Sequence, residues 1–240
     1  MPDIHNSLVS VSIFKNCDES TINNLARDAA VHQHPKGKVL FIHGEEAKHF
    51  YFIKTGWVKL FRETLDGSQA VVDILPKGHI FGETSIFEDC IYPYSAEVVQ
   101  DSEIITIPLR NLKTEIETNN KLALNMLGSM ARYRRRQDRE IEHRTIQNAS
   151  QRIGCFLLRL TDQHAQGEIT LHLPYDKTLL ASRLGMQPET FSRALSKLRD
   201  KTGIEIQGST IKMDSIHQLT DYSCAVCSSE FPCKDLEAAE

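Results

Sequence analysis

The sequence of 240 residues lacks any long apolar run, and this absence excludes a helix that crosses a membrane. No stretch approaches the roughly 20 apolar residues that such a helix needs. The first residues also lack a basic run followed by an apolar segment, so we expect no export signal. The protein is therefore predicted to be cytoplasmic, with no membrane partner.

Residue sets typical of enzymes are missing as well. The sequence has no Gly-x-x-x-x-Gly-Lys loop to cradle phosphates, and no interpretable Ser, His and Asp set or pair of carboxylates. We therefore predict that the protein is not an enzyme. Its length exceeds one typical domain and its hydrophobic content of 40% suffices for ordinary cores, so we expect two globular domains.

An overall excess of positive charge is absent too, since the formal net charge is -4 at pH 7. Evenly spread charges of this kind would argue against a DNA partner, but the cations are clustered. One cluster lies in a single predicted helix and comprises Arg132, Arg134, Arg135, Arg136, Arg139 and Arg144. A second cluster comprises Arg193, Lys197, Arg199 and Lys201. Binding to DNA is therefore compatible with the composition.

What is present is a helix-turn-helix pattern in residues 178–198. Gly185 permits a tight turn, and Pro188 suits the first position of the second helix, where a missing N–H costs nothing. Apolar side chains recur at helical spacing in that second helix and are expected to face the core: Phe191, Leu195 and Leu198. An ordinary helical hairpin with a solvated polar face remains the alternative.

The opposite face of the second helix carries side chains suited to the major groove of DNA. Arg193 can form bidentate hydrogen bonds with guanine, Glu189 can accept one from cytosine, and Ser192 can reach a base edge. Arg183 and Lys197 suit phosphates, which position a protein without specifying sequence. The predicted DNA-binding set is Gln187, Glu189, Thr190, Ser192, Arg193, Lys197 and Arg183. Apolar and polar residues then alternate about Gln207-Gly208, as in the two-stranded wing of a winged helix.

These residues carry a family resemblance. The segment Glu189-Thr-Phe-Ser-Arg193, followed by a leucine-bearing helix and a short hairpin, resembles the recognition helix of the CRP/FNR superfamily of bacterial transcription regulators. Its FNR-like form is most similar to the DNR type of nitric-oxide-responsive regulator. The resemblance, which spans about Ile13 to Leu219, implies a homodimer that reads a palindrome like TTGAT…ATCAA. It also implies contact with RNA polymerase, most simply as an activator.

The first half of the sequence predicts an all-β domain, because short runs rich in β-branched and aromatic residues are separated by turn residues. These runs are 39–42, 49–53, 56–61, 70–75, 95–99 and 103–107. A helix from Glu19 to about Asp28 precedes them. The resemblance implies a double-stranded β-helix, or jelly-roll, similar to cyclic nucleotide-binding domains.

Between the halves, residues 119–149 predict a helix far longer than average, with an apolar stripe at three- and four-residue spacing. A parallel copy from a second chain would bury this stripe as a coiled coil, which the resemblance also implies. The predicted dimerisation residues are Leu122, Met126, Met130, Tyr133 and Ile141. A single-chain helix lying on the barrel is the alternative.

The predicted fold is thus α+β. Residues 1–115 form a β-barrel sensor domain, residues 116–148 a dimerisation helix, residues 149–220 a winged helix-turn-helix domain, and residues 221–240 a tail that contains cysteines.

The resemblance places the effector pocket at Gly82, Glu83, Thr84, Tyr94 and Ser95. Cyclic-nucleotide binders of this family place Arg before a Ser or Thr, whereas this sequence has Tyr94 before Ser95. A cyclic phosphate would therefore lose its bidentate guanidinium partner, so we predict that cyclic AMP is not the signal. Glu83 is retained either as a ribose ligand or as a structural carboxylate.

The signal stays open among several chemistries. The DNR resemblance implies haem in a hydrophobic cavity between the barrel and the long helix, with a residue such as His as axial ligand. Candidate ligands are His5, His32, His34, His43, His49 and His79. An FNR-type iron–sulfur cluster is not favoured, because only Cys17 precedes Cys90. A constitutive regulator that needs no cyclic nucleotide is a further alternative.

The tail offers a different type of sensor, because Cys224, Cys227 and Cys233 place three thiols within ten residues. Such thiols can ligate zinc or an iron–sulfur cluster, form a disulfide, or respond to oxidation. A fourth ligand would come from Cys17, Cys90, Cys155 or His217. Incidental cysteines in a flexible tail are the remaining interpretation.

Overall fold

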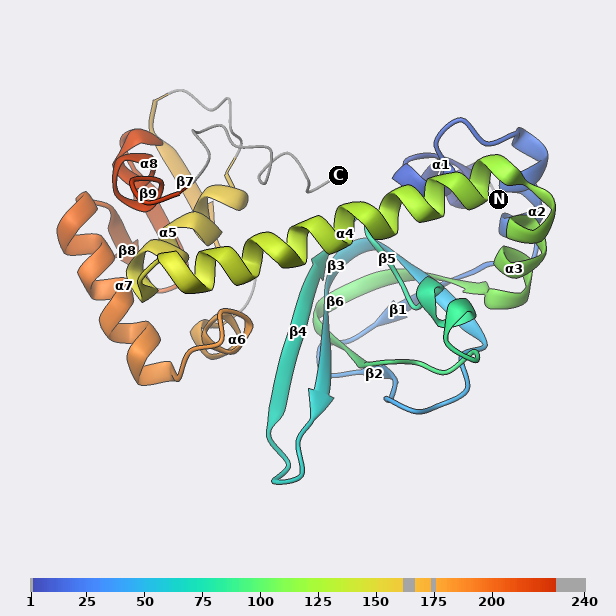
Figure 1. The fold of residues 1–240 in the computed structure, drawn as a ribbon, viewed down its shortest axis with the longest axis horizontal. Helices are drawn as coiled ribbons and strands as arrows, with labels where there is room; N and C mark the ends of the chain where they lie inside the picture. Colours follow the sequence, from blue (N-terminus) through green and yellow to red (C-terminus); the bar gives the residue numbers. More distant parts are fainter. Residues whose placement is uncertain (1, 162–166, 174–175, 228–240) are drawn as a thin grey trace. The chain divides into compact units, whose positions relative to one another are not determined.

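The computed structural model describes residues 2–161, 167–173 and 176–227. The chain divides into two compact units between Ala131 and Arg132, inside the continuous helix α4 (Asn120–Ile146) (Figure 1). We call them the N-terminal unit and the C-terminal unit, and describe each separately. Among the described residues, no helix has the length and apolar character needed to traverse a lipid bilayer.

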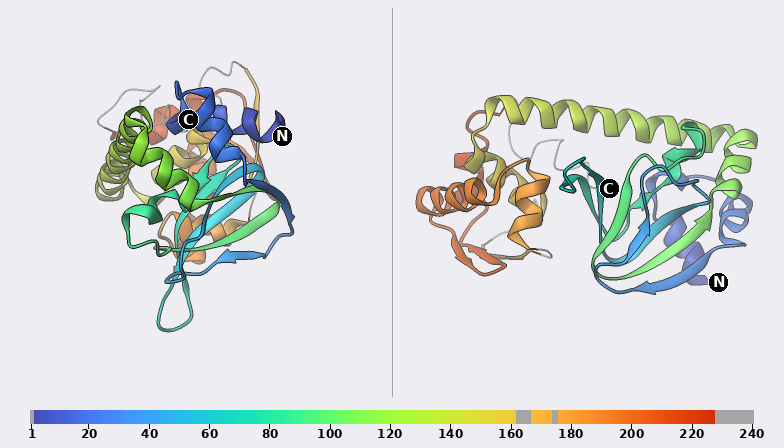
Figure 2. Two further views of the ribbon diagram at one scale, coloured as in Figure 1. Left: turned by 90° about the vertical axis from the view of Figure 1, so that its right-hand side faces the viewer. Right: turned by 90° about the horizontal axis from the view of Figure 1, so that it is seen from below.

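The N-terminal unit is built on an antiparallel sheet that curls into a barrel (Figure 2). Its strands are β1 (Ala30–His34), β2 (Val39–Phe41), β3 (His49–Glu63), β4 (Gln69–Pro76), β5 (Ile80–Phe81) and β6 (Ser95–Pro108). They are ordered β1-β6-β3-β4, with β2 paired to β6 and β5 paired to β3. The predicted jelly-roll-like β domain is confirmed.

Two pairs of predicted strands are in fact single long strands, β3 and β6. Gly56, the first residue of the predicted run 56–61, has a φ of 88° and lies inside the continuous strand β3. A Cβ at this position would collide with the Ser102 side chain and the Asp101 carbonyl of the neighbouring strand. Glycine is therefore required because the two backbones approach closely here.

Helices and 3-10 turns cover this barrel. They are α1 (Pro2–Val9), η1 (Ser12–Phe14), α2 (Glu19–Ala26), η2 (Glu83–Phe87) and α3 (Leu109–Thr118). The apolar side chains of the strands, of α2 and of α3 share one core with Leu122 and Met126 from the start of α4. The sequence analysis missed α1, α3 and β1, of which β1 is mostly exposed and polar and is held by its pairing with β6.

The C-terminal unit contains the end of α4 and a helical core with a three-stranded sheet. Its elements are α5 (Ala149–Arg159), β7 (Ile169–His172), α6 (Lys177–Arg183), α7 (Pro188–Thr202), β8 (Glu205–Gln207), β9 (Thr210–Met213) and α8 (His217–Ser223). The sheet order is β7-β9-β8, so the predicted two-stranded wing gains a third strand that was missed.

Local signals explain where these helices begin. Asn148 and Gln151 form a reciprocal capping box at the start of α5. The Asp176 carboxylate accepts a hydrogen bond of 2.8 Å from Leu179 N and caps α6. Gly185 has a φ of 62° in the turn, and α7 begins at Pro188. The predicted helix–turn–helix geometry is confirmed.

Candidate nucleic-acid interface and effector site

One face of helix α7 is buried in the core, and the opposite face is exposed to solvent. Phe191, Leu195 and Leu198 are buried, together with Ala194. The opposite side exposes Glu189, Ser192, Arg193 and Lys197, and Gln187 is exposed just before the helix. The structure thus brings the predicted base-reading and phosphate-binding side chains onto one surface, while Thr190 is half-buried beside them.

The exposed face of α7 contains a shallow depression lined by Ser192, Arg193, Ser196, Lys197, Asp200 and Lys201. Three of these residues were not in the predicted DNA-binding set: Ser196, Asp200 and Lys201. They lie three to nine positions after Ser192 and Arg193, so helical periodicity alone would have found them. Hydroxyl groups and cations on one exposed helical stripe can contact base edges and phosphates.

Arg183 does not lie on this surface. Its guanidinium forms a bidentate ion pair with the Glu140 carboxylate of α4, with Nη2–Oε1 at 2.7 Å and Nη1–Oε2 at 3.2 Å. The Arg183 side chain is only 9% exposed, so the prediction that it contacts phosphate is contradicted. A buried guanidinium whose two Nη atoms already donate to a carboxylate is not available to bind a phosphate of a nucleic acid.

Glu140 is the centre of an arginine cluster in the C-terminal unit. Besides Arg183, its carboxylate lies 3.6 Å from Arg159 Nη1 and 3.9 Å from Arg136 Nε. Burial acts to raise the pKa of Glu140, but the hydrogen bond and charge of Arg183, with the charges of Arg136 and Arg159, hold that pKa below its ordinary value. Glu140 is therefore a charged anchor that joins α4, α5 and α6.

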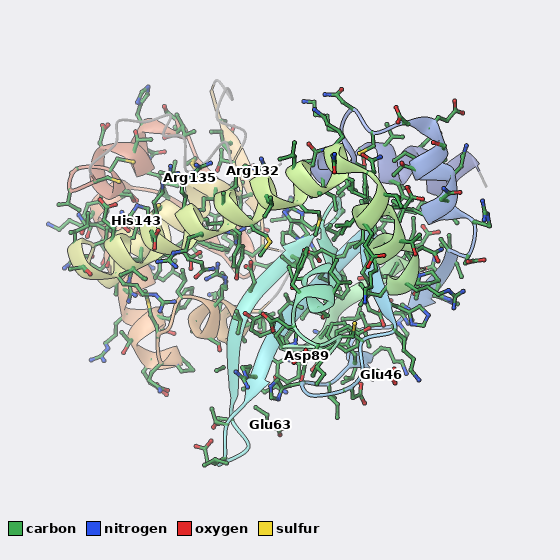
Figure 3. The ribbon with its side chains drawn as sticks, turned by 45° about the vertical axis from the view of Figure 1, so that its right-hand side comes forward. Glu46, Glu63, Asp89, Arg132, Arg135 and His143 are labelled. Atoms are coloured by element: carbon green, nitrogen blue, oxygen red, sulfur yellow. The ribbon has the colours of Figure 1, made fainter. Side chains whose placement is uncertain are left out.

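The other arginines of α4 are largely exposed. Arg134 pairs with Asp138 one turn later at 3.0 Å. Arg132 and Arg135 are exposed on the same helix (Figure 3). This part of α4 is a solvated and mainly basic surface.

The predicted dimerisation stripe of α4 needs correction. Leu122 and Met126 are 0% and 2% exposed and belong to the core of their own chain. Met130, Tyr133 and Ile141 are exposed in the single chain, and their role as dimer contacts stays a prediction. Two further exposed leucines of this helix, Leu124 at 64% and Leu127 at 61%, were not in the predicted dimerisation set. A stripe recognised by spacing alone does not reveal which partner covers it.

In the N-terminal unit, the predicted effector residues lie at the start of η2 and at the start of β6. Gly82 has a φ of 84° and precedes η2, and Glu83 is its first residue. Burial raises the pKa of Glu83 above its ordinary value. Ser95 is buried, and its Oγ accepts a hydrogen bond of 3.0 Å from His43 N, which ties β6 to the β2 loop. Tyr94 beside it supplies no cation for a phosphate.

One polar group in this region stands out. Ser85 is fully buried in η2, and its Oγ has no hydrogen-bond partner among the described residues. A buried hydroxyl without a partner costs free energy, on the order of 1–3 kcal/mol. Ser85 was not predicted, because no motif distinguishes it from its neighbours Thr84 and Ile86 in the sequence.

An aromatic stack fills the barrel beside η2. The rings of Phe41 and Tyr92 lie 3.7 Å apart, Tyr51 stacks on Phe41 at 5.4 Å, and Phe81 stacks on Tyr51 at 5.0 Å. Tyr92 also donates a hydrogen bond of 2.7 Å to the His49 carbonyl. The rings pack on each other with the geometry of a well-formed core.

The residues present do not fit the haem that the DNR resemblance implies. The expected cavity lies between the barrel and the long helix, but Leu122 and Met126 fill that boundary within the core. Among the candidate ligands only His32 and His34 share an element, strand β1. His43 is engaged, with its Nε2 2.6 Å from Arg62 Nη2.

The tail cysteines have a histidine neighbour that the sequence analysis did not select. Cys227 Sγ lies 3.6 Å from His143 Nε2, whereas the suggested ligand His217 is exposed on α8. Among the described residues, no group of three or more His, Cys, Asp or Glu side chains is arranged to hold a metal ion. The third predicted tail ligand, Cys233, lies outside the described residues.

Comparison with known proteins gives a consistent result for both units. A family model described as a cyclic nucleotide-binding domain matches residues 31–119, and one described as a Crp-like helix-turn-helix domain matches residues 151–222. The chain is 27% identical over 180 residues to the cyclic AMP receptor protein of Thermus thermophilus, covering 75% of this chain and 82% of that protein.

Solved structures agree. A candidate cyclic nucleotide-binding protein from Ruegeria pomeroyi is 30% identical, with a TM-score of 0.69 and coverage of 93% of this chain and 98% of the other. DNR from Pseudomonas aeruginosa is 28% identical, with a TM-score of 0.51 and coverage of 90% and 96%. The fold and the order of both domains are therefore shared with transcription regulators.

Proposed function

Because the chain belongs to the CRP/FNR family of DNA-binding transcription regulators, we propose that it acts as a homodimer that inserts α7 into the major groove of each half of a palindromic site. The observation that carries this proposal is the division of α7 into a buried apolar face and an exposed face with Glu189, Ser192 and Arg193. These three side chains would read bases, and Lys197 and Lys201 would contact phosphates.

We propose that the operator is FNR-like, with two half-sites about one helical turn apart, or ~34 Å in B-DNA. The arrangement Glu-x-x-Ser-Arg on the exposed face of α7 supports this half-site. Transcription activation through contact with RNA polymerase completes the proposal, by analogy with the family.

The proposed dimer contact is the exposed row along α4. Its residues are all exposed and follow one another at spacings of three, four, seven and three positions: Leu124, Leu127, Ala131, Asp138 and Ile141. Such heptad-like spacing suits a coiled coil with a second α4. Arg134, which falls in the same row, is already paired with Asp138 within one helix, so the two charges are partly neutralised at the contact.

The proposed signal is a small effector at η2 that is not cyclic AMP. Tyr94 removes the guanidinium that a cyclic phosphate needs, whereas Ser85 Oγ offers an unused polar group. Addition of cyclic AMP is therefore expected to leave DNA affinity unchanged. A rise in DNA affinity on adding cyclic AMP to the wild-type protein would contradict this part of the proposal.

The decisive experiment is selection of binding sites from a random DNA library, followed by footprinting of the selected sites. We expect a two-fold symmetric consensus with one TTGAT-like half per protomer. The Arg193→Ala variant should lose selection at one base pair of each half-site while retaining the helical circular dichroism of the wild type. Recovery of sites without symmetry or without sequence preference would overturn the proposal.

A further inference from the structure

The C-terminal unit contains a cluster of thiols around a buried histidine, away from the face of α7. His143 of α4 is 6% exposed and lies between two cysteines (Figure 3 labels His143). Cys227 Sγ lies 3.6 Å from its Nε2, and Cys155 Sγ of α5 lies 4.0 Å from its Nδ1. Both distances are within the range of hydrogen bonds that involve sulfur.

The two thiols address opposite nitrogens of the imidazole ring. Because the two sulfurs lie next to different ring nitrogens, a metal ion bound to one nitrogen would be ligated by only one of them. This geometry therefore does not suit a metal centre. A neutral imidazole instead offers one donor and one acceptor, so one thiol donates to the ring and the other accepts from it. Burial, reinforced by the Arg159 charge, lowers the pKa of His143 and favours this neutral ring at neutral pH.

The thiol of Cys224 is close enough in the chain to form a disulfide with Cys227. Its backbone N donates a hydrogen bond of 3.1 Å to the Cys224 carbonyl, which closes a turn of four residues. In such turns the first and last Cα atoms lie less than about 7 Å apart, which overlaps the roughly 4.4–6.8 Å that disulfides span. Cys155 lies inside helix α5 and has no cysteine as a near neighbour in the sequence.

We propose that Cys227 and Cys224 form a thiol–disulfide modification site for small hydroperoxide oxidants, in which His143 activates Cys227. This inference goes beyond the proposed DNA-binding function. The neutral His143 ring acts as a base that takes the proton of the Cys227 thiol as the sulfur attacks the oxidant, because the thiolate is the nucleophilic form of cysteine. Cys227 is the reactive thiol because it has both the shorter contact with His143 and the partner Cys224.

The chemistry is balanced by the hydroperoxide itself. The Cys227 thiolate attacks the peroxide, an S–O bond forms, the O–O bond breaks, and the leaving oxygen takes the proton from His143. The Cys224 thiol then attacks the sulfenic sulfur, an S–S bond forms, and water leaves. With hydrogen peroxide, two thiols are oxidised to one disulfide and the peroxide is reduced to two waters.

The site is tied to the junction of α4 and α5. Gln147 Nε2 donates to the Ser223 carbonyl at 3.5 Å, and Gln151 Nε2 donates to the Tyr222 carbonyl at 3.3 Å. The cysteine turn follows directly after these contacts. Formation of the disulfide would move the Cys227 sulfur away from His143 and remove a contact between the C-terminal segment and α4.

The test treats the full chain with hydrogen peroxide, alkylates the remaining thiols, and locates each modification by tandem mass spectrometry. We expect Cys227 to be oxidised about tenfold faster than Cys155, with a disulfide to Cys224 as the product. In Cys224→Ser, Cys227 should accumulate as a sulfenic acid that dimedone traps. The His143→Gln variant should slow oxidation of Cys227 about tenfold, whereas His217→Gln, an exposed control on α8, should not.

A second measurement uses only the wild-type protein and therefore does not depend on whether the His143 variant folds. In wild-type protein unfolded by urea, the rate advantage of Cys227 over Cys155 should disappear, because it depends on the folded contact. The proposal is overturned if Cys227 reacts no faster than Cys155 in the folded protein, if the disulfide joins Cys227 to another cysteine, or if a folded His143→Gln protein reacts at the wild-type rate. None of these steps involves DNA, so they leave the proposed function untouched.

Discussion

The bidentate pair between Arg183 and Glu140 connects α6, the first helix of the helix-turn-helix, to the C-terminal part of α4. Both side chains are nearly buried, at 9% and 13% exposure. In the proposed dimer, this pair would link the helix that forms the subunit contact to the helix-turn-helix that positions α7. The Arg183–Glu140 pair itself lies within the C-terminal unit, which begins at Arg132.

Removal of the Glu140 carboxylate should destabilise the C-terminal unit. In Glu140→Ala, Arg183 remains buried without its partner, and breaking such a pair costs about 3 kcal/mol. Urea unfolding followed by circular dichroism at 222 nm measures this loss, while fluorescence of Trp57, the only tryptophan, reports on the N-terminal unit. The helical transition should move to lower urea, and the Trp57 transition should stay in place.

The matched control for this variant is Asp200→Ala in α7. Its pair with Arg199 is exposed, at 62% and 53%, so its removal should cost less than about 1 kcal/mol. Equal losses in the two variants would show that burial of the Glu140 pair contributes nothing.

Acid should remove the contribution of Glu140. Burial acts to raise the pKa of Glu140 in the folded protein. The hydrogen bond and charge of Arg183, with the charges of Arg136 and Arg159, outweigh this effect and hold the pKa below its ordinary value. A carboxylate with a lowered pKa stabilises the fold above its unfolded pKa of about 4.3, and the stabilisation is lost as pH falls through the folded value. The stability difference between wild type and Glu140→Gln should therefore be constant from pH 7 to about 5.5 and shrink below that. A difference that stays constant to pH 3 would contradict this assignment.

Much of the C-terminal unit could be predicted because its signals are local. Gly185 and Pro188 specify the turn and the start of α7 within a few residues, and the apolar spacing of Phe191, Leu195 and Leu198 determines which face is buried. The barrel was likewise visible in its short β-branched runs. These features depend on residues that are close in the sequence.

What could not be predicted depends on partners that are distant in the sequence. Arg183 was predicted to contact phosphate because its partner Glu140 lies 43 positions earlier in the sequence. Only the folded structure brings the two side chains together. Leu122 and Met126 have the spacing of a dimer seam, but the barrel of the same chain covers them. His143 was not selected because its two cysteine neighbours come from α5 and from the residues after α8.

Two cations of α7 should respond differently to substitution. Arg193→Ala should cost about 1–3 kcal/mol on the preferred operator and little on random DNA, because its hydrogen bonds are made to a base. Lys197→Ala should weaken binding to all sequences alike and reduce the slope of log affinity against log salt by about one. Fluorescence anisotropy at several salt concentrations, on operator and on scrambled DNA, separates the two effects. Loss of specificity in the Lys197 variant, with none in the Arg193 variant, would reverse the proposed roles.

The two apolar faces of α4 give the last prediction. Leu127 is 61% exposed, so Leu127→Glu should leave the chain folded but place like charges opposite each other in a dimer. Leu122 is 0% exposed within its own chain, so Leu122→Ala should instead cost about 2–5 kcal/mol of stability. Sedimentation equilibrium should show a shift towards monomers for the first variant, with the thermal unfolding of the wild type. The second variant should remain dimeric at low temperature but unfold earlier. If Leu127→Glu sediments as the wild type does, the dimer contact lies elsewhere on the chain, and the exposed row of α4 has another partner.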